Sequence, residues 1–236
     1  MLSLKNVDSY YGESRVIENL SFEVEKGGIV GLIGRNGVGK STTLKSIMGI
    51  VKTPKGEIIF DGENIIKKPV YERVKLGIGY VPQGRDIFSR MTVEENIELG
   101  LQPKGGKGKV PDYIYDLFPI LPKFAKRKGG YLSGGQQQQL AIARALAAEP
   151  KILILDEATS SVDTRTEMHI QSAMVALMKN RTSLIIAHRL STIRDADKIV
   201  VIDGGRVAEQ GSHEELIAAK GCYYRLYQTQ FSGVKT

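Results

Sequence analysis

The sequence predicts an α/β fold built on a mostly parallel sheet, with a small antiparallel β portion attached to it. Parallel strands covered by helices on both faces are apolar throughout, and three such runs occur, at residues 152–155, 183–187 and 198–202. Helix-compatible segments accompany these strands, among them residues 136–148 and 166–179. This combination of buried strands and helices is typical of α/β proteins.

The antiparallel portion is expected near the N-terminus. Leu20, Phe22 and Val24 alternate with polar residues, and parts of residues 2–7 do the same. Alternation of this kind predicts strands with one exposed face. A further strand is expected at residues 57–61, where it ends at an Asp-Gly turn.

Composition is that of an ordinary globular protein. The 236 residues are 42% hydrophobic and 25% charged, which is enough apolar material for a large core. The net charge of +7 lies in local clusters without interleaved aromatic residues, so nucleic-acid binding is not expected. Without an 18-residue apolar run or a signal-like N-terminus, we expect a cytoplasmic chain that does not span a membrane. The single cysteine, Cys222, is expected to be a small apolar residue in a C-terminal helix.

The apolar residues 29–33 lead into a glycine-rich segment, Gly34-Arg35-Asn36-Gly37-Val38-Gly39-Lys40-Ser41. A strand, such a turn and a helix form the context of a phosphate-binding P-loop, because glycines let backbone N–H groups point at anionic oxygens. The helix N-terminus adds its positive dipole. Lys40 is expected to reach the β- and γ-phosphates, and the Ser41 hydroxyl to bind Mg²⁺. The expected nucleotide-binding residues are Gly34, Asn36, Gly37, Gly39, Lys40, Ser41 and Thr42.

Two carboxylates, Asp156 and Glu157, directly follow the apolar strand at residues 152–155. At the carboxyl edge of a parallel sheet, beside a P-loop, Asp156 can coordinate Mg²⁺. Glu157 can then orient or deprotonate a water that attacks the γ-phosphate. The alternative is a solvated strand end with no chemical role.

A second anion-binding element is expected at Ser133-Gly134-Gly135-Gln136, before a helix-forming run. A hydroxyl and exposed N–H groups at a helix start can bind phosphate, although a serine and two glycines are also an ordinary helix start. In a chain that has a P-loop, such an element needs a partner. The natural arrangement is a head-to-tail homodimer that holds ATP between the P-loop of one copy and this serine–glycine turn of the other.

Together these elements resemble the ATPase domain of ATP-binding-cassette (ABC) transporters over nearly the whole chain. The resemblance rests on the P-loop, Gln83, residues 132–136, Asp156-Glu157, residues 160–163 and His188. It implies a single domain, residues 1–236, with a P-loop NTPase core at residues 1–83 and 141–236. Residues 84–140 would form a helical subdomain, as the prolines and the glycine–lysine loop after residue 84 also indicate.

The resemblance also implies roles for residues that have no clear pattern of their own. Tyr11 would stack on the adenine, with Tyr10 as the weaker candidate. Asp163 would lie in a loop that crosses the dimer interface, and His188 would hydrogen-bond the γ-phosphate. The implied catalytic residues are Glu157, His188 and Gln83, and the implied metal ligands are Ser41, Gln83 and Asp156. By contrast, the capping-box spacing of Ser212 and Glu215 gives His213 a sufficient structural explanation, as a helix start.

The implied function is ATP hydrolysis with Mg²⁺, in which two ATP molecules close a homodimer that moves a separate membrane permease. The domain would then be peripheral on the inner face of the membrane. A non-transport cassette ATPase of cytosolic assembly or translation type is the alternative. A P-loop kinase would need neither the serine–glycine turn nor His188, and a scaffold with a degenerate site would not need the catalytic residues.

The resemblance is not uniform along the chain. Up to about residue 135, segments 10–14, 78–85 and 91–96 resemble ATPase subunits of branched-chain amino acid or urea importers. From about residue 140, segments 156–160, 187–193 and 210–216 resemble the nucleotide-binding domain of multidrug or lipid exporters. We therefore expect an engineered chimera joined between about residues 132 and 146, with an importer permease as any native-like partner and amino-acid transport as its role. A naturally divergent subunit is the alternative.

Overall fold

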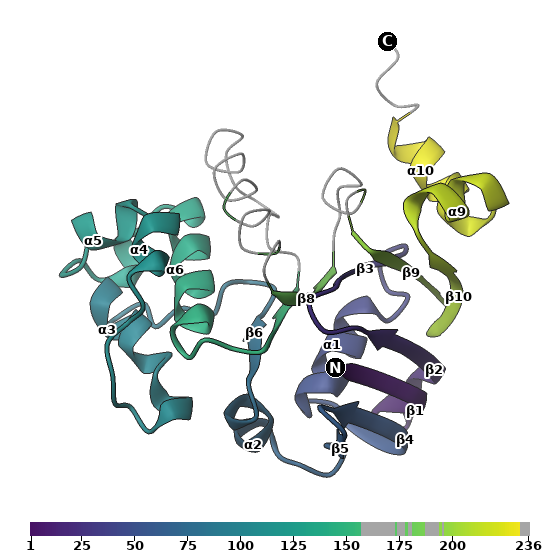
Figure 1. Cartoon of the computed structure of the whole chain (residues 1–236), viewed down its shortest axis with the longest axis horizontal. Coiled ribbons are helices and arrows are strands. Elements are labelled where there is room, and N and C mark those ends of the chain that lie inside the picture. Colours follow the sequence, from purple (N-terminus) through teal and green to yellow (C-terminus); the bar gives the residue numbers. More distant parts are fainter. Residues whose placement is uncertain (157–172, 174–177, 179–180, 187–193, 195, 232–236) are drawn as a thin grey trace. The chain divides into compact units, whose positions relative to one another are not determined.

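The computed structural model describes residues 1–156, 173, 178, 181–186, 194 and 196–231 (Figure 1). The chain divides into two compact units, Met1–Val70 with Thr182–Thr236, and Tyr71–Arg181. The P-loop segment belongs to the first unit. Gln83, the serine–glycine turn and Asp156 belong to the second.

The first unit contains two sheets with their helices. Its elements are β1 (Leu2–Tyr11), β2 (Ser14–Val24), β3 (Ile29–Ile33), α1 (Lys40–Met48), β4 (Lys52–Phe60), β5 (Glu63–Asn64), β8 (Thr182–Ile186), β9 (Lys198–Asp203), β10 (Arg206–Gly211), α9 (His213–Ala219) and α10 (Cys222–Phe231). An antiparallel sheet has the order β2-β1-β4-β5. In the other sheet, β3 pairs in parallel with both β8 and β9, and β10 pairs antiparallel with β9. The predicted combination of parallel and antiparallel strands is confirmed.

The antiparallel sheet supports the helix that follows the P-loop. Leu4 of β1 lies opposite Phe22 of β2, and both side chains are buried, as their alternation with polar residues predicts. Helix α1 packs against β1, β2 and β4. The Ser46 hydroxyl of α1 donates a hydrogen bond of 2.8 Å to the Ser9 hydroxyl of β1. Both partners are buried, so this bond holds the helix at one position on the sheet.

Strand β3 places the glycine-rich segment at its carboxyl end. Val30 lies opposite Leu184 of β8 and Lys198 of β9, so β3 is paired on both sides (Figure 1). The strand ends at Ile33, and α1 begins at Lys40. The predicted order of strand, glycine-rich turn and helix is therefore present.

The second unit combines a parallel strand pair with a group of helices. Its elements are α2 (Val70–Lys75), β6 (Ile78–Val81), α3 (Val93–Leu99), the 3-10 helix η1 (Gln102–Lys104), α4 (Tyr113–Leu117), α5 (Ile120–Lys123), the 3-10 helix η2 (Gly129–Tyr131), α6 (Gly134–Ala147) and β7 (Ile152–Leu155). Strands β6 and β7 pair in parallel. Helix α6 contacts α3, α4 and α5, which gather beside β6 in Figure 1. It begins two residues before the helix predicted at residues 136–148, whereas most of the segment predicted at 166–179 lies outside the described residues.

A buried asparagine organises the segment that precedes α3. The Asn96 side chain accepts a hydrogen bond from the Phe88 N–H at 2.9 Å and donates to the Phe88 carbonyl at 3.0 Å. It also donates to the Thr92 carbonyl at 2.8 Å. Asn96 is fully buried, so these bonds satisfy its amide and fix the chain between β6 and α3.

The C-terminal helices α9 and α10 pack against β3 and β9 within the first unit. Ser212 and Glu215 form the predicted capping box at the start of α9, and Cys222 begins α10 as predicted. Tyr223 is fully buried in a cluster with Ile33 and Ile199, and burial raises the pKa of its phenol to about 12. Across the residues that the structure describes, we find no helix with the length and apolar character needed to cross a bilayer.

Candidate nucleotide site

The start of α1 leaves its backbone N–H groups without a side-chain cap. Gly39 occupies the N-cap position with φ 109°, in the left-handed region, and it has no side chain that could accept from the first turn. No acidic residue lies in that turn either. The helix start therefore offers N–H donors and a positive dipole end to an anion, as the P-loop assignment expects.

Two glycines of the loop are required by close packing as well as by conformation. A Cβ on Gly34, which has φ 148°, would lie 2.2 Å from the Ile202 carbonyl oxygen of β9. A Cβ on Gly39 would lie 2.6 Å from Cδ1 of Ile17. Larger residues at these positions would displace the loop from the end of β9 and from β2.

The loop is also tied to a turn that the sequence analysis did not single out. The Gly205 N–H donates to the Val38 carbonyl at 3.0 Å, and the Gly205 carbonyl accepts from the Glu18 N–H at 3.0 Å. Gly205 has φ 76°, and a Cβ there would lie 2.2 Å from the Val16 carbonyl oxygen. The Asp-Gly-Gly sequence at residues 203–205 signals a turn, but it does not say that this turn supports the P-loop.

Lys40 lies against the loop itself. Its side chain is buried, and the ammonium donates to the carbonyl oxygens of Gly34 and Arg35, both at 2.8 Å. These bonds satisfy a charge that would be costly to bury alone. For Lys40 to reach phosphate oxygens, its ammonium has to exchange these carbonyls for the nucleotide.

The other predicted residues of the first unit lie on neighbouring elements. Ser41 and the buried Thr42 belong to the first turn of α1. Tyr11 ends β1 opposite Ser14 and is 48% exposed, so its ring has a free face. Tyr10, the weaker candidate for stacking, is less exposed than Tyr11. Stacking of Tyr11 on adenine stays a prediction.

In the second unit, Asp156 follows β7 and is fully buried. Its N–H donates to the Val81 carbonyl at 2.9 Å, and Tyr80 places its hydroxyl 3.4 Å from the carboxylate. A buried carboxylate requires compensating donors or cations, which fits a metal-binding position. Tyr80 was not among the expected residues, because its position on β6 says nothing about its partner.

Gln83 lies just beyond β6 and is exposed. The three residues after it, Gly84, Arg85 and Asp86, all have positive φ values, of 92°, 75° and 45°. For the two residues with side chains, this backbone is strained by about 1–2 kcal/mol each. The strain marks the segment that leads from β6 to the helices.

The serine–glycine turn forms a closed capping box. The Ser133 hydroxyl accepts from the Gln136 N–H at 3.4 Å, and the Gln136 side chain accepts from the Ser133 N–H at 3.0 Å. The Arg85 guanidinium lies close to Gly134, since a Cβ on this glycine would be 3.1 Å from it. Gly135 is buried in the first turn of the helix. The expected helix start is present, and its phosphate role stays a prediction.

A half-buried arginine connects α6 with the segment after Gln83. The Arg144 guanidinium donates to the Arg85 carbonyl at 3.5 Å and lies 5.1 Å from the centre of the Phe88 ring. Burial lowers the pKa of this guanidinium. The predicted residues Glu157, Asp163 and His188 lie outside the described residues.

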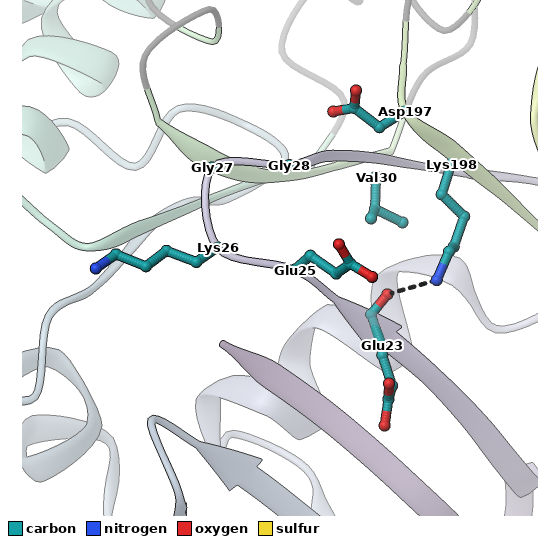
Figure 2. Close-up of a pocket in the computed structure, with 8 residues that line it drawn as sticks. All are labelled: Glu23, Glu25, Lys26, Gly27, Gly28, Val30, Asp197 and Lys198. Atoms are coloured by element: carbon teal, nitrogen blue, oxygen red, sulfur yellow. Dashed lines mark hydrogen bonds between the residues drawn. The ribbon is translucent and has the colours of Figure 1, made fainter.

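A separate cavity of about 360 Å³ lies at the amino end of β3 (Figure 2). Charges of both signs line it: Glu23, Glu25, Asp197, Lys26 and Lys198. The Lys198 ammonium donates to the Glu23 carbonyl at 3.4 Å, and Asp197 accepts from the Ile29 N–H at 2.7 Å. Figure 2 shows Lys26 extending away from the other side chains. These bonds join the segments around the amino ends of β3 and β9. No P-loop residue lines this cavity.

Comparisons with known proteins agree with this geometry. A family model described as "ABC transporter" matches residues 17–160, more than half of the chain. The ATP-dependent lipid A-core flippase of Haemophilus ducreyi is 41% identical over 234 residues, which cover 95% of this chain and 40% of the flippase. The chain thus spans about two fifths of the length of this relative.

Solved structures extend the similarity. A bacterial Atm1-family ABC exporter with ATP bound superposes with a TM-score of 0.84 at 35% identity, over 98% of this chain and 41% of the exporter chain. A dimeric ATP-binding cassette with ADP and Pi gives a TM-score of 0.79 at 29% identity, over 90% of this chain and 98% of the cassette.

These similarities run through both halves of the chain. The chimera, the importer-like first half and amino-acid transport are therefore not supported. Short segments such as residues 10–14 carried that interpretation, and short segments are outweighed by similarity over the full length. The chain belongs to the ABC transporter family, and it is an ATP-hydrolysing ATPase domain of that family.

Proposed function

We propose that this chain powers an exporter, and that two copies of it bind two ATP molecules between them in a head-to-tail homodimer. The observation that carries the proposal is the start of α1, where a left-handed glycine takes the place of a capping side chain. The 41% identity with a lipid A-core flippase supports the exporter type, with an amphiphilic substrate as the starting hypothesis. An integral membrane partner, attached or separate, would place the domain at the inner face of the membrane.

In this arrangement each ATP contacts both copies. The P-loop, residues 34–42, holds the phosphates, and Tyr11 stacks on the adenine. The serine–glycine turn, residues 133–136, of the second copy closes on the γ-phosphate, and Asp163 lies at the interface. The similarity to a dimeric ATP-binding cassette supports this assembly.

Hydrolysis then depends on a water placed in line with the γ-phosphate. Glu157 accepts a proton from this water as its oxygen attacks phosphorus, and the bond to the ADP oxygen breaks. Lys40 and His188 hold the γ-phosphate oxygens, and Gln83 orients the water. Product release reopens the dimer and passes the change to the membrane partner.

Mg²⁺ fits the residues that are present. Ser41 offers a hydroxyl in the first turn of α1, and Asp156 offers a buried carboxylate at the end of β7. With Gln83, these are oxygen ligands of the kind that Mg²⁺ prefers. When bound, the ion would offset the negative charge of the phosphates.

The helical subdomain, residues 84–140, is proposed to contact the membrane partner, with residues 1–83 and 141–236 as the core. Two aromatic side chains support this surface, because Phe88 is 50% exposed and Tyr131 is 70% exposed. The Gly130 N–H donates to the Ser89 carbonyl at 2.9 Å, which brings their two segments together. Large exposed aromatic residues are typical of interaction surfaces.

Glu157→Gln tests the proposed mechanism and assembly. The change removes the base but keeps the phosphate and metal ligands, so turnover should fall by about 100-fold or more while ATP-dependent dimers persist. Light scattering after size exclusion at saturating ATP and Mg²⁺ measures the dimer, and phosphate release measures turnover. Lys40→Ala is the matched control, because it should lose both. A monomeric Glu157→Gln protein under these conditions would falsify the sandwich arrangement.

A further inference from the structure

A second cavity of the first unit lies on the outer side of the P-loop. It has a volume of about 590 Å³, and three segments far apart in sequence line it. These are residues 34–36 of the loop, the end of β9 and one side of α10. Lys40, Ser41 and Thr42, which are expected to hold the phosphates, are not part of the lining. The size suits a small ligand.

The wall formed by α10 is firmly anchored. The Glu209 carboxylate of β10 accepts hydrogen bonds from the N–H groups of Cys222 and Tyr223, so an acidic side chain caps the start of α10. A Cβ on Gly221 would lie 1.9 Å from Oε1 of Glu209, so a larger residue there would displace this carboxylate from its capping position. Tyr223 buries its whole side chain beneath the helix. The cavity therefore has a fixed wall.

The lining combines positive charge with apolar surface. Arg35 and Arg225 both line the cavity and are exposed, and Asp203 is the one carboxylate of the lining. Neither guanidinium has an ion-pair partner in the described part of the chain. Leu226 and the buried Ile202 provide the apolar part. Guanidinium groups are suited to carboxylate and phosphate ligands.

The cavity shares its wall with the contacts that hold Lys40. The Gly34 and Arg35 carbonyls accept from the Lys40 ammonium, and both residues line the cavity. Gly34 also lies directly against Ile202, another lining residue. A ligand that braces these residues stabilises the arrangement in which Lys40 bonds to the loop instead of to a nucleotide.

We propose that this cavity binds a small amphiphilic anion, with an apolar body and one carboxylate or phosphate, and that its occupation opposes nucleotide binding. Arg35 and Arg225 hold the anionic group, and Leu226 and Ile202 contact the body. Because linkage is reciprocal, nucleotide should weaken the binding of this anion by the same factor.

Cys222 provides a direct readout, because it lines the cavity and is the single cysteine of the chain. Its thiolate attacks one sulfur of 2,2′-dithiodipyridine, a mixed disulfide forms as the reagent's S–S bond breaks, and pyridine-2-thione leaves and is measured by absorbance. Labelling is followed without nucleotide, in the presence of 4-nitrobenzoate, 4-nitrophenyl phosphate or the uncharged 4-nitrobenzamide. At least one anion should slow labelling in a saturable way and the amide should not, and the two anions distinguish a carboxylate from a phosphate ligand.

Arg225→Gln should raise the anion concentration needed for half-protection about tenfold, the effect of losing one charge-assisted hydrogen bond. Lys26→Gln removes the same charge at the cavity of Figure 2 and should leave protection unchanged. The site would be overturned if the amide protected Cys222 as well as the anions do, or if neither anion protected it. It would also be overturned if protection were unaltered in Arg225→Gln. Labelling that slows with protein concentration alone would also overturn it, because a second copy would then cover the cavity.

The coupling is measured separately, as the affinity for a fluorescent ATP analogue with and without the protecting anion. The anion should lower this affinity in the unaltered protein, and the same decrease should need about ten times more anion in Arg225→Gln. Equal affinities in the unaltered protein would overturn the coupling. Because protection of Cys222 is measured without nucleotide, a failure of the proposed nucleotide site leaves that result intact.

Discussion

The helix after the P-loop and the helix after the serine–glycine turn begin in opposite ways, although both are expected to bind phosphate. Helix α1 has a left-handed Gly39 at its N-cap and no side-chain acceptor. Helix α6 has Ser133 at its N-cap, and Gln136 completes a capping box. The N-cap residue of α1 therefore offers its N–H groups no side-chain acceptor, whereas Ser133 and Gln136 already satisfy two donors of α6.

The two expected phosphate-binding elements therefore differ in the internal bonds that they must give up before they bind phosphate. At the start of α1, the Lys40 ammonium has to leave the Gly34 and Arg35 carbonyls before it can bond to phosphate. The start of α6 has to exchange a local bond, from the Gln136 N–H to the Ser133 hydroxyl, for a bond to phosphate. An element that is stable without ligand fits a role that begins only when a second copy arrives.

The largest effect is expected from Lys40→Ala. The change removes the ammonium that would form charge-assisted bonds to the phosphates, so ATP affinity should fall by about 100-fold or more. Titration calorimetry with ATP and Mg²⁺ measures this loss. Lys26→Ala, at an exposed lysine of the same unit, is the control and should bind normally. Unchanged affinity in Lys40→Ala would remove the P-loop assignment.

A smaller effect is expected from Gly34→Ala, which breaks the packing of the uncapped loop. Its Cβ would lie 2.2 Å from the Ile202 carbonyl, so the free energy of unfolding should fall by about 2–4 kcal/mol. Gly37→Ala is the matched control, because Gly37 also has positive φ but no atom within 4 Å of the added Cβ. It should lose only about 1–2 kcal/mol through backbone strain. Equal losses in urea unfolding would mean that β9 does not constrain the loop.

The smallest effect is expected from Ser133→Ala, which makes the start of α6 resemble that of α1. Loss of the cap should lower the free energy of unfolding by about 1 kcal/mol and leave ATP affinity of the monomer unchanged. ATP-dependent dimerisation should weaken, since the hydroxyl is proposed to reach the γ-phosphate of the other copy. Gln136→Glu is the sharper companion, because it keeps the capping box while adding a negative charge at the helix start. It should preserve stability and still weaken the dimer, and normal dimers in both variants would assign the turn to structure alone.

Local patterns predicted local structure well. The glycine-rich segment between an apolar run and a helix-forming run, and the spacing of Ser212 and Glu215, depend on neighbours in sequence, and the structure contains both. Contacts between residues far apart in the sequence could not be predicted from these patterns. Gly205 supports Val38, and Tyr80 lies beside Asp156, because the fold brings them together and not because of any pattern around them.

The local nature of sequence motifs also explains the chimera interpretation, which the comparisons do not support. Segments such as residues 78–85 resemble importer ATPases, but each is only a few residues long. The flippase relative matches over 95% of the chain, and this includes the half that those segments were taken to represent. Motif segments establish chemistry, because few residue types can bind phosphate or metal, but they separate subfamilies poorly.

The bond between Val38 and Gly205 has a consequence for protein synthesis. The P-loop precedes the residues that support it by about 170 positions, because Gly34 rests on Ile202 and Val38 accepts from Gly205. At about 5–20 residues per second, translation leaves these early residues without their support for roughly ten seconds or longer. A nascent chain should therefore acquire nucleotide affinity only after residue 205 has left the ribosome. ATP-affinity capture of ribosome-stalled chains of increasing length would detect that onset.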